Sequence, residues 1–125
     1  MSNPNIVAVT SILGKADGAN LANNTSNVLL ANAASSGFVY KINQIVAANI
    51  DGSTAVNTTV GINTVANGSG TTFPIVSTVS VPADASLIVV DKTTAIYLEE
   101  NKSITVQSGT ASKIAYTISY EIIAS

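Results

Sequence analysis

The hydrophobic positions of this chain recur with a period of two along most of its length. The alternation is cleanest near the end, where Ile114, Tyr116, Ile118, Tyr120 and Ile122 are separated by small or polar residues. Because successive side chains of a strand point to opposite faces, this pattern predicts a strand with one buried face. No segment has the 3.6-residue period of an amphipathic helix. We therefore expect an all-β protein.

Short stretches with strand character recur at spacings of about ten residues, separated by turn-forming residues. They lie at 6–13, 28–30, 38–50, 56–62, 73–81, 87–90, 96–98, 104–106 and 114–122. Eight or nine short antiparallel strands predict a β-sandwich, with a jelly roll as the leading variant. The length of 125 residues predicts a single domain, 1–125, with a short extended N-terminal arm at 1–5.

Four local features carry more specific expectations. Asp51-Gly52 is a turn signal, so 38–62 is predicted to form a hairpin. Gln44 interrupts the apolar face of its strand, which predicts a bulge or bend there. Leu87–Val90 is wholly apolar and is expected to be covered on both faces. The Asn-rich segment 16–27 is expected to be a loop, with a possible short strand around Leu21.

The composition favours a surface that contacts other proteins. Val, Ile and Thr fill 42 positions, whereas Leu occurs six times, which agrees with strands rather than helices. Charged residues make up 10% of the chain, against about 25% in an average protein. Ser, Thr and Asn together also fill 42 positions, with Thr common to both groups, so the surface consists mostly of short uncharged side chains. Since Lys and Glu are depleted in interface cores, this surface suits packing against other protein copies; the alternative is a soluble domain of low charge.

The residue types that are missing exclude several functions. The chain contains no Arg, and Lys15, Lys41, Lys92, Lys102 and Lys113 are scattered singly, which argues against nucleic-acid binding. It contains no His and no Cys, so imidazole chemistry, zinc clusters and disulfides are excluded. Its apolar runs are far shorter than the ~20 residues that span a bilayer, and no signal peptide is evident. We expect a protein made in the cytoplasm, with no membrane role.

Asp91, Glu99 and Glu100 are the nearest approach to a carboxylate cluster. Paired carboxylates could bind calcium or act as general acid and base. Their spacing does not match a calcium loop, and we favour the interpretation that they keep two turns solvated. We therefore expect no catalytic, cofactor-binding or metal-binding residues, and a protein that is not an enzyme.

Tyr40, Tyr97, Tyr116 and Tyr120 could form an aromatic platform for a sugar. Tyr116 and Tyr120 share the apolar face of the last strand, where large side chains normally fill a core. Tyr97 lies on the opposite parity to Ile96 and Leu98 and is the better candidate for an exposed ring.

Two further motifs are weak. Asn-x-Ser/Thr triplets, the acceptor sites for N-glycans, begin at Asn23, Asn24, Asn57, Asn67 and Asn101. A chain this rich in Asn, Ser and Thr contains such triplets by chance, so they are not taken as glycan sites. The spacing of Gly68 and Gly70 suggests a phosphate-cradling loop only superficially, because neither a helix nor a Lys follows.

Several of these segments resemble small virion proteins of tailed bacteriophages, especially phages of marine bacteria and cyanobacteria. The resemblance is carried by 3–15 (NPNIVAVTSILGK), 39–52 (VYKINQIVAANIDG), 81–104 (VPADASLIVVDKTTAIYLEENKSI) and 118–123 (ISYEII). It therefore spans nearly the whole chain. Related proteins often have Gly-Asp after the paired Glu, where this chain has Asn101-Lys102, and the 64–72 loop is particular to this chain.

The resemblance implies a non-enzymatic β-sandwich on the capsid surface of a phage, where it decorates and reinforces the shell by binding the major capsid protein. The segments 1–5, 16–27 and 63–72 are the expected contact elements, since they are long and polar. A homo-oligomer, with a trimer as our guess, would match the local symmetry of a capsid. Two alternatives remain: a tail, neck or fibre-associated adaptor of the virion, and a carbohydrate-binding module that uses Tyr97.

Overall fold

The structure, a computed structural model, describes residues 11–21 and 23–124, and these form nine strands and one short 3₁₀ helix. The elements in chain order are β1 (Ser11–Asn20), β2 (Asn27–Asn32), β3 (Phe38–Asn49), β4 (Val56–Asn63), β5 (Thr72–Val81), β6 (Ser86–Val90), η1 (Lys92–Thr94), β7 (Ile96–Leu98), β8 (Lys102–Ser108) and β9 (Ile114–Ala124). The predicted all-β class is confirmed. In the described residues no helix is long and apolar enough to cross a bilayer.

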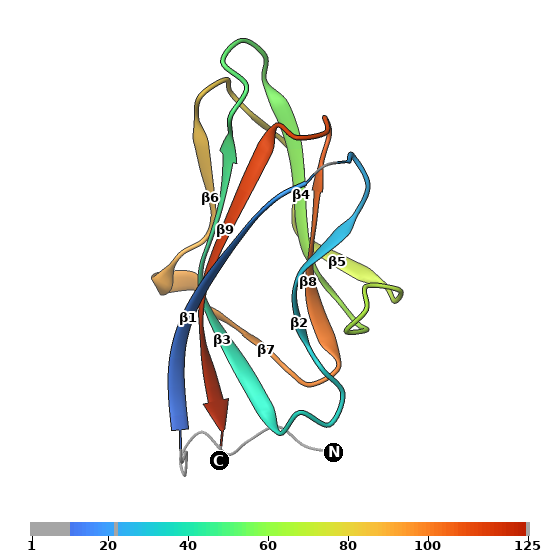
Figure 1. The fold of residues 1–125 in the computed structure, drawn as a ribbon, viewed down its shortest axis with the longest axis vertical. Coiled ribbons are helices and arrows are strands. Elements are labelled where there is room, and N and C mark those ends of the chain that lie inside the picture. Colours follow the sequence, from blue (N-terminus) through green and yellow to red (C-terminus); the bar gives the residue numbers. More distant parts are fainter. Residues whose placement is uncertain (1–10, 22, 125) are drawn as a thin grey trace.

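The strands form two antiparallel sheets that face each other (Figure 1). Sheet A has the order β1-β9-β3-β6, with β7 also pairing with β3, and sheet B has the order β2-β8-β4-β5. If β6 and β7 are counted as one interrupted strand, each sheet has four strands, and the chain passes between the sheets in the order of a jelly roll. The predicted jelly-roll-like sandwich is therefore confirmed.

The core lies between the two sheets and is built from the alternating residues that the sequence indicated. On β9, Ile114, Tyr116 and Ile118 are buried, and the residues between them point outward. Sheet B supplies the opposite side of the core, with Ile104 and Val106 on β8 and Val56 and Val60 on β4. The sheets are held together by apolar side chains with a period of two, as in other sandwiches.

The predicted bulge near Gln44 is confirmed, but three other local expectations are wrong. The register of β3 against β9 shifts between Ile42 and Gln44. The hairpin at 38–62 does not form, because β3 belongs to sheet A and β4 to sheet B. The segment around Asp51-Gly52 is longer than a two-residue turn and carries the chain from one sheet to the other. Leu87–Val90 is not covered on both faces: β6 is an edge strand and Ile88 is 59% exposed.

The third wrong expectation concerns 16–27, whose first part is strand rather than loop. β1 continues to Asn20, paired in unbroken register with β9 from Ser11↔Ala124 to Asn20↔Ala115. Its Gly, Asp and Asn content disfavours a strand, but pairing along the whole of β9 overrides this local preference. Most of the strand predicted at 6–13, and the arm at 1–5, lie outside the described residues.

Candidate binding surface

The carboxylates that were considered as a possible metal or catalytic group have separate structural tasks. Glu99 forms an ion pair with Lys102, with 3.2 Å between Oε1 and Nζ. Glu100 Oε2 accepts a hydrogen bond from the backbone N–H of Gly37 at 2.9 Å, which ties the β7–β8 turn to the β2–β3 turn. These side chains hold turns in place.

Asp91 is the N-cap of the 3₁₀ helix η1. Its Oδ1 accepts hydrogen bonds from the backbone N–H groups of Thr93 and Thr94. The backbone N–H of Asp91 in turn donates to Thr94 Oγ1 at 3.2 Å, which completes a capping box. The hydrogen bonds from Thr93 are the main reason why the pKa of Asp91 is lowered. The residue is an exposed N-cap.

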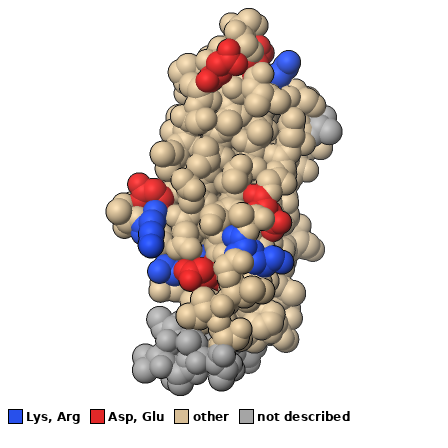
Figure 2. Space-filling model, turned by 60° about the vertical axis from the view of Figure 1, so that its left-hand side comes forward, with Lys and Arg blue, Asp and Glu red and all other residues tan. Residues whose placement is uncertain are grey.

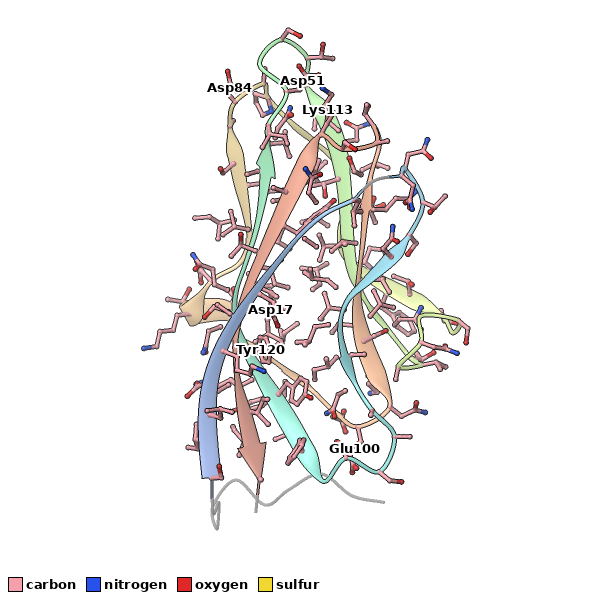
Figure 3. The ribbon with its side chains drawn as sticks, in the orientation of Figure 1. Asp17, Asp51, Asp84, Glu100, Lys113 and Tyr120 are labelled. Carbon is pink, nitrogen blue, oxygen red and sulfur yellow. The ribbon has the colours of Figure 1, made fainter. Side chains whose placement is uncertain are left out.

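Asp51 and Asp84 lie together at one end of the sandwich (Figure 3). The pKa of Asp51 is lowered, chiefly by hydrogen bonds from the backbone and side chain of Ser53 and secondarily by the charge of Lys113. Three or more acidic side chains do not come together as a metal-binding group anywhere in the described residues.

The four tyrosines do not form a common platform. Tyr116 and Tyr120 are buried, as predicted, and are 1% and 4% exposed. Tyr40 is half-buried and stacks on Tyr120, with ring centroids 5.5 Å apart. Tyr97 is 48% exposed on β7, so the prediction of an exposed ring is confirmed for this residue.

Both buried tyrosine hydroxyls have hydrogen-bond partners that join different parts of the fold. Tyr116 Oη lies 2.5 Å from Thr58 Oγ1 and donates to the Gln107 carbonyl at 2.9 Å, so it bridges the two sheets. Tyr120 Oη donates to Asp17 Oδ2 at 2.9 Å. Burial, followed by the hydrogen bond to Asp17 and its negative charge, raises the pKa of Tyr120 to about 12. Asp17 and Tyr120 thereby link β1 to β9 through their side chains (Figure 3).

Three buried asparagines at strand ends hold the loops in place, and the sequence analysis did not identify them. Asn32, Asn49 and Asn63 are each the last residue of a strand and are at most 2% exposed. Asn32 Nδ2 donates to the carbonyls of Phe38 and Leu98 at 3.0 Å each. The detectable signal is an Asn that directly follows an apolar strand and precedes a loop rich in Gly, Ser or Asp.

Asn63 has the most extensive of these networks. Its Nδ2 donates to the carbonyls of Gly68 and Gly70 at 3.1 Å and to Thr72 Oγ1 at 2.9 Å. Its Oδ1 accepts from the N–H groups of Val65 and Gly70 at 3.0 Å. The glycines of this loop therefore serve its shape, with Gly68 at a positive φ of 81°. The polar contact element predicted at 63–72 is held by internal hydrogen bonds.

The asparagines of the Asn-x-Ser/Thr triplets also include turn-forming residues. Asn23 Oδ1 accepts from the N–H of Thr25 at 3.1 Å, and Asn67 Oδ1 accepts from the N–H of Ser69 at 3.0 Å. These are Asx turns, in which the side chain stands in for a backbone carbonyl. Their spacing to Ser or Thr is accounted for by turn formation.

Among the hollows on the described part of the chain, two lie against sheet B. The larger has a volume of about 220 Å³ and the smaller about 130 Å³. Thr59 and Gln107 line both of them, and no residue that lines either hollow is ionisable. The hollows offer hydroxyl and amide groups without a general acid or base.

Part of the outer face of sheet A is uncharged and consists mostly of small residues, and we call this part the small-residue face. Because Tyr116 and Ile118 point into the core, the residues that alternate with them on β9 point outward, together with their partners on β1 and β3. The small-residue face consists of Ala16, Gly18, Val46, Ala48, Ala115, Thr117 and Ser119. Figure 2 shows charged side chains at one end of the molecule and in a band across its lower half, with an uncharged expanse between them.

The strand β1 borders this face and is exposed on both sides. Each of its residues is exposed apart from Ala19, which is partly buried, and Ile12 and Leu13 are 56% and 55% exposed. Of the predicted contact segment 16–27, the structure thus places the first five residues on an open sheet edge. The small-residue face and β1 could not be identified from the sequence, because both depend on which strands are neighbours.

Comparisons with known proteins bear on the fold. No protein-family model and no curated protein sequence matches the chain. A solved structure of Bacillus endospore appendages, described as a novel family of disulfide-linked pili, is similar, with a TM-score of 0.52, 14% identity, and coverage of 92% of this chain and 90% of that chain. Chains of infectious bursal disease virus match more weakly. The Gx strain has a TM-score of 0.48 at 7% identity and the Gt strain 0.43 at 6%. The matched regions cover 90% and 91% of this chain but only 31% and 33% of the two viral chains, respectively. The likeness to the pilus protein shows that the two chains share the sandwich fold.

Proposed function

We propose that this chain is a non-enzymatic structural protein of a phage virion, which lies on the capsid surface and binds the assembled major capsid protein. The observation that carries the proposal is the small-residue face of sheet A. Interface cores are depleted in charged residues, and an uncharged sheet face loses little solvation energy when a partner covers it. The sequence resemblance supports the virion as the setting.

The binding would be non-covalent and repeated. The appendage proteins with the similar fold are described as disulfide-linked, whereas this chain has no Cys and cannot form a disulfide with a partner. A contact of standard size buries about 1,600 Å² in total. Many modest contacts on one symmetric shell reinforce one another, because each protein bridges neighbouring subunits.

The first experiment is the copy number of this protein in purified virions, measured by quantitative mass spectrometry against the major capsid protein. We expect hundreds of copies, the stoichiometry of a capsid decoration protein. A dozen or fewer would place the protein in the tail or neck. Its absence from the particle would refute the virion role altogether.

A second experiment tests the face itself. Thr117 is exposed at the centre of the small-residue face, so Thr117→Glu places a charge there without disturbing the core. The matched control is Ser80→Glu, at an exposed position on β5 of sheet B. We expect Thr117→Glu to weaken binding to capsids that lack the protein and Ser80→Glu to leave it unchanged. Equal binding by both variants would show that another surface makes the contact.

The second candidate function is carbohydrate binding, which is favoured by the exposed ring of Tyr97 on β7. A glycan array would test it. Binding that Tyr97→Ala abolishes would support a sugar site, whereas binding by neither protein would remove this candidate.

A further inference from the structure

The four edges of the two sheets differ in how they are protected against pairing with another strand. β5 contains Pro74 and two register shifts against β4. β6 and β7 are short and separated by η1, and β2 is six residues long with a shift between Val28 and Leu30. Proline, bulges, short strands and charged side chains are the usual protections of a sheet edge. β1 has only the last of these, in Lys15 and Asp17: it is ten residues long and in unbroken register with β9.

The backbone groups that β1 presents to its open side follow from the hydrogen-bond pattern of β9. The N–H of Ile50 donates to the carbonyl of Lys113 at 2.8 Å, so the odd-numbered residues of β9 bond to β3 and the even-numbered ones to β1. Their partners on β1 are odd-numbered. In agreement, Leu21 accepts a bond from Ser112, on the same side as β9. The N–H and C=O groups of 12, 14, 16, 18 and 20 therefore face the open edge.

We propose that β1 pairs antiparallel with β1 of a second copy of this chain, across a two-fold axis that passes through Ala16. Sheet A would then continue without interruption through both copies. In this register the residues with open backbone groups meet one another: Ala16 meets its own counterpart and Gly14 meets Gly18. About ten backbone hydrogen bonds would form, two for each such pair.

Charge complementarity selects both the partner and the register. With Ala16 on the axis, Lys15 of each copy lies directly opposite Asp17 of the other, on the same face, and Leu13 lies opposite Ala19. Moving the axis by one residue to Lys15 would preserve the hydrogen-bonding parity but would place the two Lys15 side chains opposite each other, which is unfavourable. Lys15 has no ion pair with a described residue of its own chain. Asp17 uses Oδ2 for Tyr120 and has its second oxygen left for a partner.

A charge-reversal cycle tests the pairing in the full chain. Lys15→Asp turns two attractive cross-strand pairs into repulsive ones. We expect it to raise the dimer dissociation constant by about tenfold or more in sedimentation velocity over a concentration series. The double variant Lys15→Asp/Asp17→Lys restores complementarity and should recover dimerisation. Failure of this rescue in a folded double variant, or a wild-type protein that stays monomeric throughout the series, would overturn the proposal.

Single cysteines test the register, because the chain has no Cys of its own. Ala16→Cys would lie about 5.5 Å from its counterpart between Cα atoms, within the range of a disulfide. We expect it to cross-link under oxidation. Gly14→Cys is the matched control: a Cβ there has open space, but its counterpart would be about 14 Å away along the strand. Cross-linking of Gly14→Cys without Ala16→Cys would refute this register.

A backbone variant separates strand pairing from contacts between side chains. Ala16→Pro removes an N–H that faces the open edge and leaves the bonds to β9 intact, so the monomer should keep its circular dichroism spectrum and dimerisation should be lost. A folded Ala16→Pro protein that still dimerises would overturn the proposal. The inference does not rest on the capsid role: a dimer in solution can exist without virion binding, and the copy number in virions is measured separately.

Discussion

The loop at 64–71 is predicted to depend on one buried amide, that of Asn63, and Asn63→Ala tests this dependence. The side chain is completely buried and makes five hydrogen bonds to the loop and to the start of β5. Removing it leaves those donors and acceptors without their partner inside the fold. Because Gly70 is exposed and Val65 half-buried, water can reach part of the network and recover some of the loss.

The magnitude follows from this count. A typical hydrogen bond contributes about 1 kcal/mol net to stability, so five bonds set an upper figure of about 5 kcal/mol, and partial rehydration reduces the expected loss to about 2–4 kcal/mol. For a chain of this length, 1 kcal/mol corresponds to roughly 4 °C in Tm, so we expect a decrease of about 10 °C. The assay is thermal and urea unfolding followed by circular dichroism.

Two matched variants make the test specific to the network. Asn67→Ala lies in the same loop but is exposed, and it should cost less than about 1 kcal/mol. Asn63→Asp keeps the shape but replaces the donor that faces three acceptors, so it should be at least as destabilising as Asn63→Ala at neutral pH. If Asn63→Ala shifts Tm no more than Asn67→Ala does, the amide does not hold the loop and the reasoning is refuted.

Three further predictions follow from individual contacts. Gly61→Ala should destabilise the fold by about 1–3 kcal/mol in urea unfolding, because its Cβ would lie 2.7 Å from the Phe73 carbonyl oxygen, whereas Gly14→Ala, which meets open space, should not. Equal midpoints for the two variants would contradict this. Tyr116→Phe removes a hydroxyl that bridges the sheets and should cost about 1–2 kcal/mol; an unchanged midpoint would mean that water replaces the bridge. Tyr120, with its pKa raised to about 12, should ionise in an ultraviolet absorbance titration well above an ordinary tyrosine near 10. Since the unfolded chain releases this proton first, stability is complete below pH 10 and falls as the pH rises from 10 to 12. A Tyr120 that ionises near 10 in the folded protein would contradict this prediction.

The inward faces of the strands could be predicted from the sequence, because a period of two specifies which side chains share a face. The burial of Tyr116 and Tyr120 and the exposure of Tyr97 followed directly from parity. The bulge at Gln44 was visible as a break in that parity. Each of these features depends on the residues of a single strand, so the sequence of that strand is enough to predict it.

The neighbours of each strand could not be predicted in the same way. Parity carries no information on which strand lies alongside, so Asp51-Gly52 indicated a hairpin where the chain crosses between sheets. The small-residue face could not be predicted for the same reason. It exists because Ala16, Thr117 and Val46 come from three strands that lie side by side. The hydrogen-bond networks of Asn32, Asn49 and Asn63 were also missed, because the residue type alone does not separate buried from exposed asparagines; only their position at the end of an apolar strand does.

The composition of β1 connects the two surfaces proposed for contact. Its Gly14, Gly18 and Asn20 are poor strand formers, and the strand contributes no residue to the buried core cluster. Its side chains thus stabilise the monomer through little more than the Asp17–Tyr120 hydrogen bond, and its conformation depends on the ladder with β9. Gly14, Ala16 and Gly18, however, are small outward-facing residues that continue the small-residue face onto β1. A second copy paired along β1 would bring the small-residue faces of the two copies side by side. The pairing of the two β1 strands would then fix the distance between the small-residue faces of the two copies, both of which would contact subunits of the capsid.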